Sequence, residues 1–142
     1  MQKLINIITH PLTIIISFLM IIIVGQDLGG FYIFYIILAI PHFGIHAMLA
    51  ILGILILLIN YYSLRKYAGY LIHQLLNIVG VLLLALSLYT FFYQDPDHYN
   101  EATLHQVIPL IIIGIYFVFS TSFLIQNLLS VFKNRRNSVG KG

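Results

Sequence analysis

The stretch YAGYLIHQLLNIVGVLLLALSLYTFFY, residues 67–93, contains no Asp, Glu, Lys or Arg. About 20 helical residues cross the roughly 30 Å hydrocarbon core of a bilayer, so this stretch predicts a transmembrane helix. Three further runs share its length and apolar character, at residues 4–25, 31–62 and 106–132. The short breaks between the runs predict one domain, an all-α membrane protein built as an antiparallel up-down-up-down bundle of four transmembrane helices.

The composition excludes an ordinary soluble domain. Of the 142 residues, 61% are hydrophobic and 8% are charged, whereas a soluble domain is about 45–50% apolar and about 25% charged. The absence of Cys excludes disulfides and thiolate metal sites. The basic residues lie near the ends of the runs and do not interleave with exposed aromatic residues. We therefore expect a lipid bilayer, and not nucleic acid, around this chain.

The charged residues sort by sign when the N-terminus is placed in the cytoplasm and the chain crosses four times. The basic residues then all fall on the cytoplasmic side: Lys3, Arg65, Lys66, Lys133, Arg135, Arg136 and Lys141. The acidic residues all fall on the opposite side: Asp27, Asp95, Asp97 and Glu101. This distribution satisfies the positive-inside rule. It predicts a multi-pass protein of the cell (inner) membrane with both termini cytoplasmic and a short basic tail at residues 133–142.

The second run is longer than one membrane crossing requires. As a straight helix, residues 31–62 would measure about 48 Å. Proline removes a helical hydrogen bond and clashes with the preceding turn, so we expect the helix to kink near Pro41. Residues 31–40 would then form a tilted or interfacial aromatic segment, and the crossing would start at about His42.

Helical periodicity places the polar residues of each run on one face, which predicts a polar, histidine-bearing bundle interior. The expected interior residues, other than histidine, are Asn6, Thr13, Ser17, Asn60, Asn77, Ser87, Tyr116 and Asn127. The expected interior histidines are His10, His42, His46, His73 and His105. Polar side chains between membrane helices often serve only as packing contacts, and this reading remains open for each of them.

Two histidines are expected in one layer of the bundle. His10 and His73 each lie seven residues from a cytoplasmic Lys, which places both about 10 Å from that membrane edge. An outer pair would combine His42 or His46 with His105. Paired imidazoles on facing helices are the ligands of a b-type haem, so haem b is a candidate cofactor.

A divalent metal ion is the other candidate cofactor. His42 and His46 are spaced i, i+4, which aligns two ring nitrogens on one helical face. His105 is the third candidate ligand, and an outer-loop residue among Asp95, Asp97, His98 and Glu101 would complete the set. The spacing lacks the Glu of the HExxH motif, so it does not indicate hydrolysis.

The runs contain no catalytic Ser-His-Asp set, no paired carboxylates and no phosphate-binding loop, so we do not expect an enzyme. The sequence favours a non-enzymatic subunit or ligand-binding module of a membrane complex, associated with other membrane proteins or with itself. Two alternatives stay open. One is a bis-histidine haem subunit for electron transfer, and the other is a proton or small-solute permeation pathway.

Overall fold

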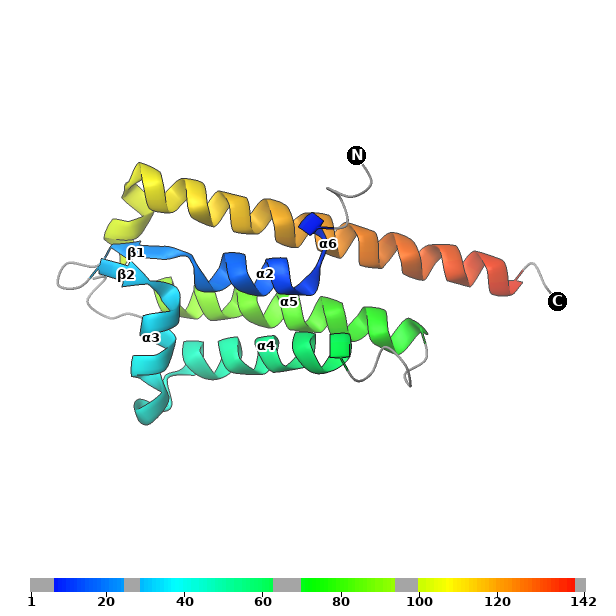
Figure 1. Cartoon of the computed structure of the whole chain (residues 1–142), viewed down its shortest axis with the longest axis horizontal. Coiled ribbons are helices and arrows are strands. Elements are labelled where there is room, and N and C mark those ends of the chain that lie inside the picture. Colours follow the sequence, from blue (N-terminus) through cyan, green and yellow to red (C-terminus); the bar gives the residue numbers. More distant parts are fainter. Residues whose placement is uncertain (1–6, 25–28, 63–69, 94–99, 140–142) are drawn as a thin grey trace.

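The computed structural model describes residues 7–24, 29–62, 70–93 and 100–139 (Figure 1). Its elements in chain order are α2 (Pro11–Leu19), β1 (Ile22–Val24), β2 (Gly29–Phe31), α3 (Tyr32–Ala39), the short 3-10 helix η1 (Ile40–His42), α4 (Ile45–Tyr62), α5 (Tyr70–Tyr93), the 3-10 helix η3 (Glu101–His105) and α6 (Val107–Val139). Three of the described helices are long and apolar enough to cross a membrane, with windows at Ile45–Tyr62, Leu71–Tyr93 and Val107–Phe132. This is compatible with a membrane protein.

The first apolar run is not one continuous helix over residues 4–25. Helix α2 has 9 residues, about 14 Å of helix, and the strand β1 follows after a two-residue turn. β1 pairs with β2 in an antiparallel hairpin, in the register Ile22↔Phe31 and Val24↔Gly29. The cause lies in the sequence at 21–24, IIIV, because β-branched side chains favour an extended backbone.

The backbone of the hairpin is closed by contacts outside the sheet. The Tyr32 N–H donates to the Ile21 carbonyl over 2.7 Å. The Val24 N–H donates to Thr103 Oγ1 over 3.0 Å, and the same hydroxyl donates to the Val24 carbonyl over 3.3 Å. Ile21, Ile23 and Thr103 are fully buried. These contacts give partners to the Ile21 carbonyl and to both backbone polar groups of Val24.

The chain breaks at Pro41 where the sequence predicted a kink. α3 ends at Ala39, η1 carries Pro41, and Phe43 adopts the left-handed conformation with φ 53°. A left-handed residue stops a helix and redirects the chain. α3 therefore lies crosswise over one end of the bundle, and α4 starts a separate path along it (Figure 1). We call this end, where α3, η3 and the hairpin lie, the hairpin end.

Two glycines bring α4 and α5 into close contact. A Cβ added to Gly53 would lie 2.9 Å from the Gly80 carbonyl oxygen, and one added to Gly80 would lie 2.7 Å from Leu57 Cγ. Half of the apolar window of α5 is buried, against 28% for the windows of α4 and α6. α5 is thus the central helix. α6 extends past the other helices at the end opposite the hairpin (Figure 1).

The middle of the bundle is an apolar and aromatic core. Phe18 of α2 packs edge-on against Tyr32 and tilted against Tyr116, with ring centroids 5.2 Å and 5.6 Å apart. Leu57 of α4 and Leu84 of α5 are fully buried beside them in the same core. The outward faces of α4, α5 and α6 carry exposed Leu, Ile, Val and Phe side chains, as expected for helices in lipid.

Candidate ligand-binding pocket

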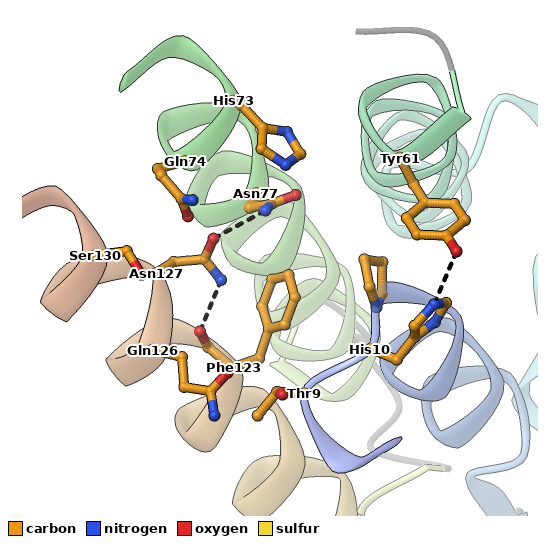
Figure 2. Close-up of a pocket in the computed structure, with 11 residues that line it drawn as sticks. Thr9, His10, Tyr61, His73, Gln74, Asn77, Phe123, Gln126, Asn127 and Ser130 are labelled. Carbon is orange, nitrogen blue, oxygen red and sulfur yellow. Dashed lines mark hydrogen bonds between the residues drawn. The ribbon is translucent and has the colours of Figure 1, made fainter. Parts of the chain in front are cut away.

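A pocket of about 520 Å³ lies between the helices at the end opposite the hairpin (Figure 2). It is formed by the start of α2, the end of α4, the start of α5 and residues 123–130 of α6. Its lining residues are Thr9, His10, Pro11, Tyr61, His73, Gln74, Asn77, Phe123, Gln126, Asn127 and Ser130. Most of these side chains carry hydrogen-bonding groups, which is unusual within an apolar helix bundle.

His10 occupies the N-terminus of α2 and is bonded through both ring nitrogens. Its Nδ1 accepts the backbone N–H of Leu12 over 3.3 Å, which caps the helix, and Pro11 stands at the first helical position. The ring hydrogen must then lie on Nε2, which donates to the Tyr61 hydroxyl over 3.0 Å. The capping bond to Leu12 therefore fixes the tautomer of His10. The bond to Tyr61 joins α2 to α4.

On the other side of the pocket, amide side chains link three helices. The Asn60 amide nitrogen donates to Asn77 Oδ1 over 2.6 Å, and the Asn77 amide nitrogen donates to Asn127 Oδ1 over 2.8 Å. The Asn127 amide nitrogen donates to the Phe123 carbonyl over 2.8 Å. Asn60, Asn77 and Asn127 are at most 6% exposed. We call these three side chains the asparagine chain.

His73 is attached to the beginning of this chain. Its Nδ1 donates to Asn60 Oδ1 over 2.7 Å, because an amide oxygen can only accept. The second hydrogen of the Asn60 amide goes to the His73 carbonyl over 2.8 Å. His73 and His10 thus line the same pocket.

Gln74 is the exception among the amides of the wall. It is 8% exposed, and its Oε1 is buried with no hydrogen-bond partner in the described part of the chain. A buried acceptor without a donor costs about 1–3 kcal/mol, so such atoms are rare in folded proteins. Figure 2 shows Gln74 next to Asn127, between α5 and α6.

Gln74 and Tyr61 were not among the residues expected at the site. The periodicity argument centred the inner face of α5 on His73, whereas the buried positions of α5 include Gln74, Asn77, Val81, Leu84 and Leu88. Gln74 is therefore near the centre of that face, and His73 is half-buried at its edge. A polar residue within a predicted span was the available signal for Gln74. Tyr61 lies at the end of an apolar run, a position typical of an interfacial tyrosine.

The other expected interior residues have separate environments. Ser87 and Tyr116 are fully buried, away from the pocket lining. The Thr13 and Ser17 hydroxyls donate to the carbonyls of Ile7 and Ile14 over 2.6 Å and 3.0 Å, within their own segment. Asn6 lies outside the described residues.

His46 is part of an aromatic cluster at the hairpin end. Its ring lies 5.1 Å from Phe91 and 6.4 Å from Tyr32, measured between ring centroids. The Ser87 hydroxyl donates to the His46 carbonyl over 2.7 Å, and it also bonds the Tyr32 hydroxyl over 2.9 Å. These contacts join α3, α4 and α5.

The expected metal ligands His42, His46 and His105 are not assembled. Within the described ranges, no group of three His, Cys, Asp or Glu side chains can hold an ion. His42 and His105 are exposed on η1 and η3. The i, i+4 alignment of His42 and His46 requires a continuous helix, and the left-handed Phe43 between them breaks it. Asp95, Asp97 and His98 lie outside the described residues.

Comparison with known proteins adds no relative. The chain matches no family model, and no curated protein and no solved structure is significantly similar to it. The function must therefore be argued from the pocket itself.

Proposed function

We propose that this protein is a multi-pass membrane protein that binds a small polar molecule in the pocket between α2, α4, α5 and α6, as a non-enzymatic ligand-binding module of a membrane complex. The observation that carries the proposal is the wall of the pocket. Amides, imidazoles and hydroxyls converge there from four segments of an otherwise apolar bundle. A concave site with a few convergent polar groups is the usual form of a ligand site.

The wall is suited to binding more than to proton transfer. Asn and Gln amides do not titrate, and the described lining includes no carboxylate. The one unprotonated nitrogen of His10, Nδ1, accepts the Leu12 N–H, and the Nδ1–H of His73 donates to Asn60, so neither of these nitrogens is a free base. A general base needs a nitrogen directed at the substrate. This arrangement supports a binding module.

We further propose that four segments cross the membrane, the first of them discontinuous. Residues 11–24, a helix followed by extended chain, measure about 30 Å, the thickness of the hydrocarbon core. This topology places the end with the pocket on the cytoplasmic side and the hairpin end on the opposite side, in agreement with the distribution of Lys and Arg in the sequence. Both termini would be cytoplasmic. The exposed apolar faces would contact lipid or partner subunits.

A haem is the second candidate ligand, since His10 and His73 line the same pocket. A bis-histidine site there would require the His10 ring to leave Tyr61. We rank permeation lower, because the fully buried apolar residues Phe18, Leu57 and Leu84 occupy the bundle beyond the pocket.

Native mass spectrometry of the protein purified in mild detergent tests the proposal. We expect a bound small molecule on the wild type and on Leu129→Trp, whose position is exposed on α6. Ser130→Trp, one residue further and in the pocket lining, should lose it because the indole fills the space. A Soret band in the absorption spectrum would identify the molecule as haem. Equal occupancy in both variants, or an empty wild type, would refute the pocket as a ligand site.

A further inference from the structure

Resting on the proposed function, we propose that the ligand is a neutral molecule with a hydroxyl group that donates a hydrogen bond to Gln74 Oε1. A glycerol-type hydroxyl has this chemistry. It can come from a free polyol or from the headgroup of a neutral membrane lipid.

The side-chain oxygen of Gln74 is a hydrogen-bond acceptor without a donor among the described residues. The side chain is more than nine-tenths buried, it belongs to the lining of the pocket, and its Oε1 has no partner among the described residues. An amide oxygen can be satisfied only by a donor. A molecule in the pocket that carries an O–H or N–H group would supply one.

Other hydrogen-bonding groups of the pocket walls are bonded within the protein. In the asparagine chain, both amide hydrogens of Asn60 and one each of Asn77 and Asn127 donate to other protein oxygens, and Gln74 Oε1 accepts from no described residue. On the opposite wall, the Tyr61 oxygen accepts from His10 Nε2, which directs the Tyr61 O–H hydrogen elsewhere and calls for an acceptor. A ligand with hydroxyl groups can donate at one wall and accept at the other.

The charge of the lining and the depth of the pocket along α6 also restrict the ligand. None of the lining residues in the described chain is Asp, Glu, Lys or Arg. An ionised ligand would lack a partner in this apolar bundle, and burying an unpaired charge is unfavourable. Gln126 lies seven positions before Lys133, about 10 Å along α6. In the proposed topology this lies near the boundary between the headgroups and the hydrocarbon core.

The binding test compares wild type with Gln74→Leu, a change that removes the acceptor and keeps the approximate volume. The probes are glycerol, dioctanoylglycerol, and dioctanoyl phosphatidic acid as the charged counterpart with the same chains. Binding to the full-length protein in detergent is measured by native mass spectrometry, together with the thermal unfolding midpoint. Gln106→Leu, the same substitution at an exposed glutamine outside the pocket lining, is the matched control.

We expect dioctanoylglycerol to bind the wild type and Gln106→Leu, and to bind Gln74→Leu at least tenfold more weakly. Glycerol should behave in the same way if a free polyol is the source, and should not bind if the lipid is. Without ligand, Gln74→Leu should unfold at the same temperature as the wild type or higher, since it removes an unpaired buried acceptor. A merely structural role of Gln74 would lower that temperature.

Several outcomes overturn this inference. They are equal binding of dioctanoylglycerol to wild type and Gln74→Leu, preference for phosphatidic acid, loss of stability in ligand-free Gln74→Leu, and binding of none of the probes. With any of these outcomes, the pocket is still a ligand site if Ser130→Trp displaces a co-purified molecule, and only the role of Gln74 is wrong. If Ser130→Trp displaces nothing, the proposed function itself fails.

Discussion

At the scale of single residues, Asn77 holds the polar wall together because it is the only member of the asparagine chain that is bonded to both of the others. It accepts from Asn60 on α4 and donates to Asn127 on α6. Removing it would leave a donor on one helix and an acceptor on another without their partner. Hydrogen bonds of this kind between membrane helices contribute about 0.6–2 kcal/mol each.

We therefore expect Asn77→Leu to lower the free energy of unfolding by about 1–3 kcal/mol, as measured by denaturant titration in detergent micelles. Ser122→Ala is the control, because that hydroxyl bonds only the carbonyl of Val118 within α6. It should change the stability little. An Asn77→Leu protein as stable as the wild type would contradict the bonding pattern described for this wall.

Residue periodicity predicted that Asn60, Asn77 and Asn127 face the bundle interior. It predicted neither the burial of Gln74 nor the separation of the outer histidines. Asn60, Asn77 and Asn127 lie in regular helices, where the period of 3.6 residues holds. His42 and His46 lie on either side of Phe43, whose left-handed backbone no periodicity argument can anticipate. Gln74 was left out because a stripe drawn through His73 misses the centre of the buried face by about one residue.

At the scale of elements, the contact of α4 with α5 depends on glycines that leave no room for a methyl group. A Cβ on Gly80 would meet Leu57 Cδ2 at 2.8 Å, and the helices are already in backbone contact. Gly114 on α6 differs, since nothing lies within 4 Å of its added Cβ. The two positions therefore form a matched pair.

We expect Gly80→Ala to destabilise the protein by about 1–3 kcal/mol, because the helices must separate or Leu57 must leave its rotamer. Gly114→Ala should be neutral or slightly stabilising, since alanine favours a helix more than glycine does. The measurement is the unfolding midpoint of each variant in the same detergent. Equal effects of the two substitutions would show that the close approach of α4 and α5 is not limiting.

The elements also show where a hydropathy argument stops. It located α4, α5 and α6, because length and apolar composition are sufficient for a continuous helix. It could not separate α2 from β1, since both are apolar and only the β-branched run at 21–24 distinguishes them. The hairpin further depends on Thr103, a partner far away in the sequence.

At the scale of the whole molecule, the proposed orientation can be tested directly because the chain has no native cysteine. Single cysteines introduced at Gln2, Gln106 and Asn137 report the N-terminus, the hairpin end and the end of α6. With a membrane-impermeant maleimide on intact cells, we expect labelling at Gln106→Cys alone. Lysis should expose the other two.

Each alternative topology has its own labelling pattern. If Gln2→Cys and Gln106→Cys both react in intact cells, residues 11–24 do not cross, and the chain has three crossings. If Asn137→Cys reacts and Gln106→Cys does not, the orientation is inverted and the pocket opens toward the outside. A detergent-solubilised sample labelled at all three sites is the control for reactivity.

The bond between Val24 and Thr103 also determines the order in which the protein is completed during biosynthesis. The two residues are 79 positions apart, so the ribosome must translate α4 and α5 before the partner of Val24 exists. Until then the Val24 N–H lacks its acceptor, which is an unfavourable state in lipid if this segment crosses the membrane as proposed. The segment that emerges first is thus among the last to reach its final conformation, and truncation before Thr103 leaves it unfinished.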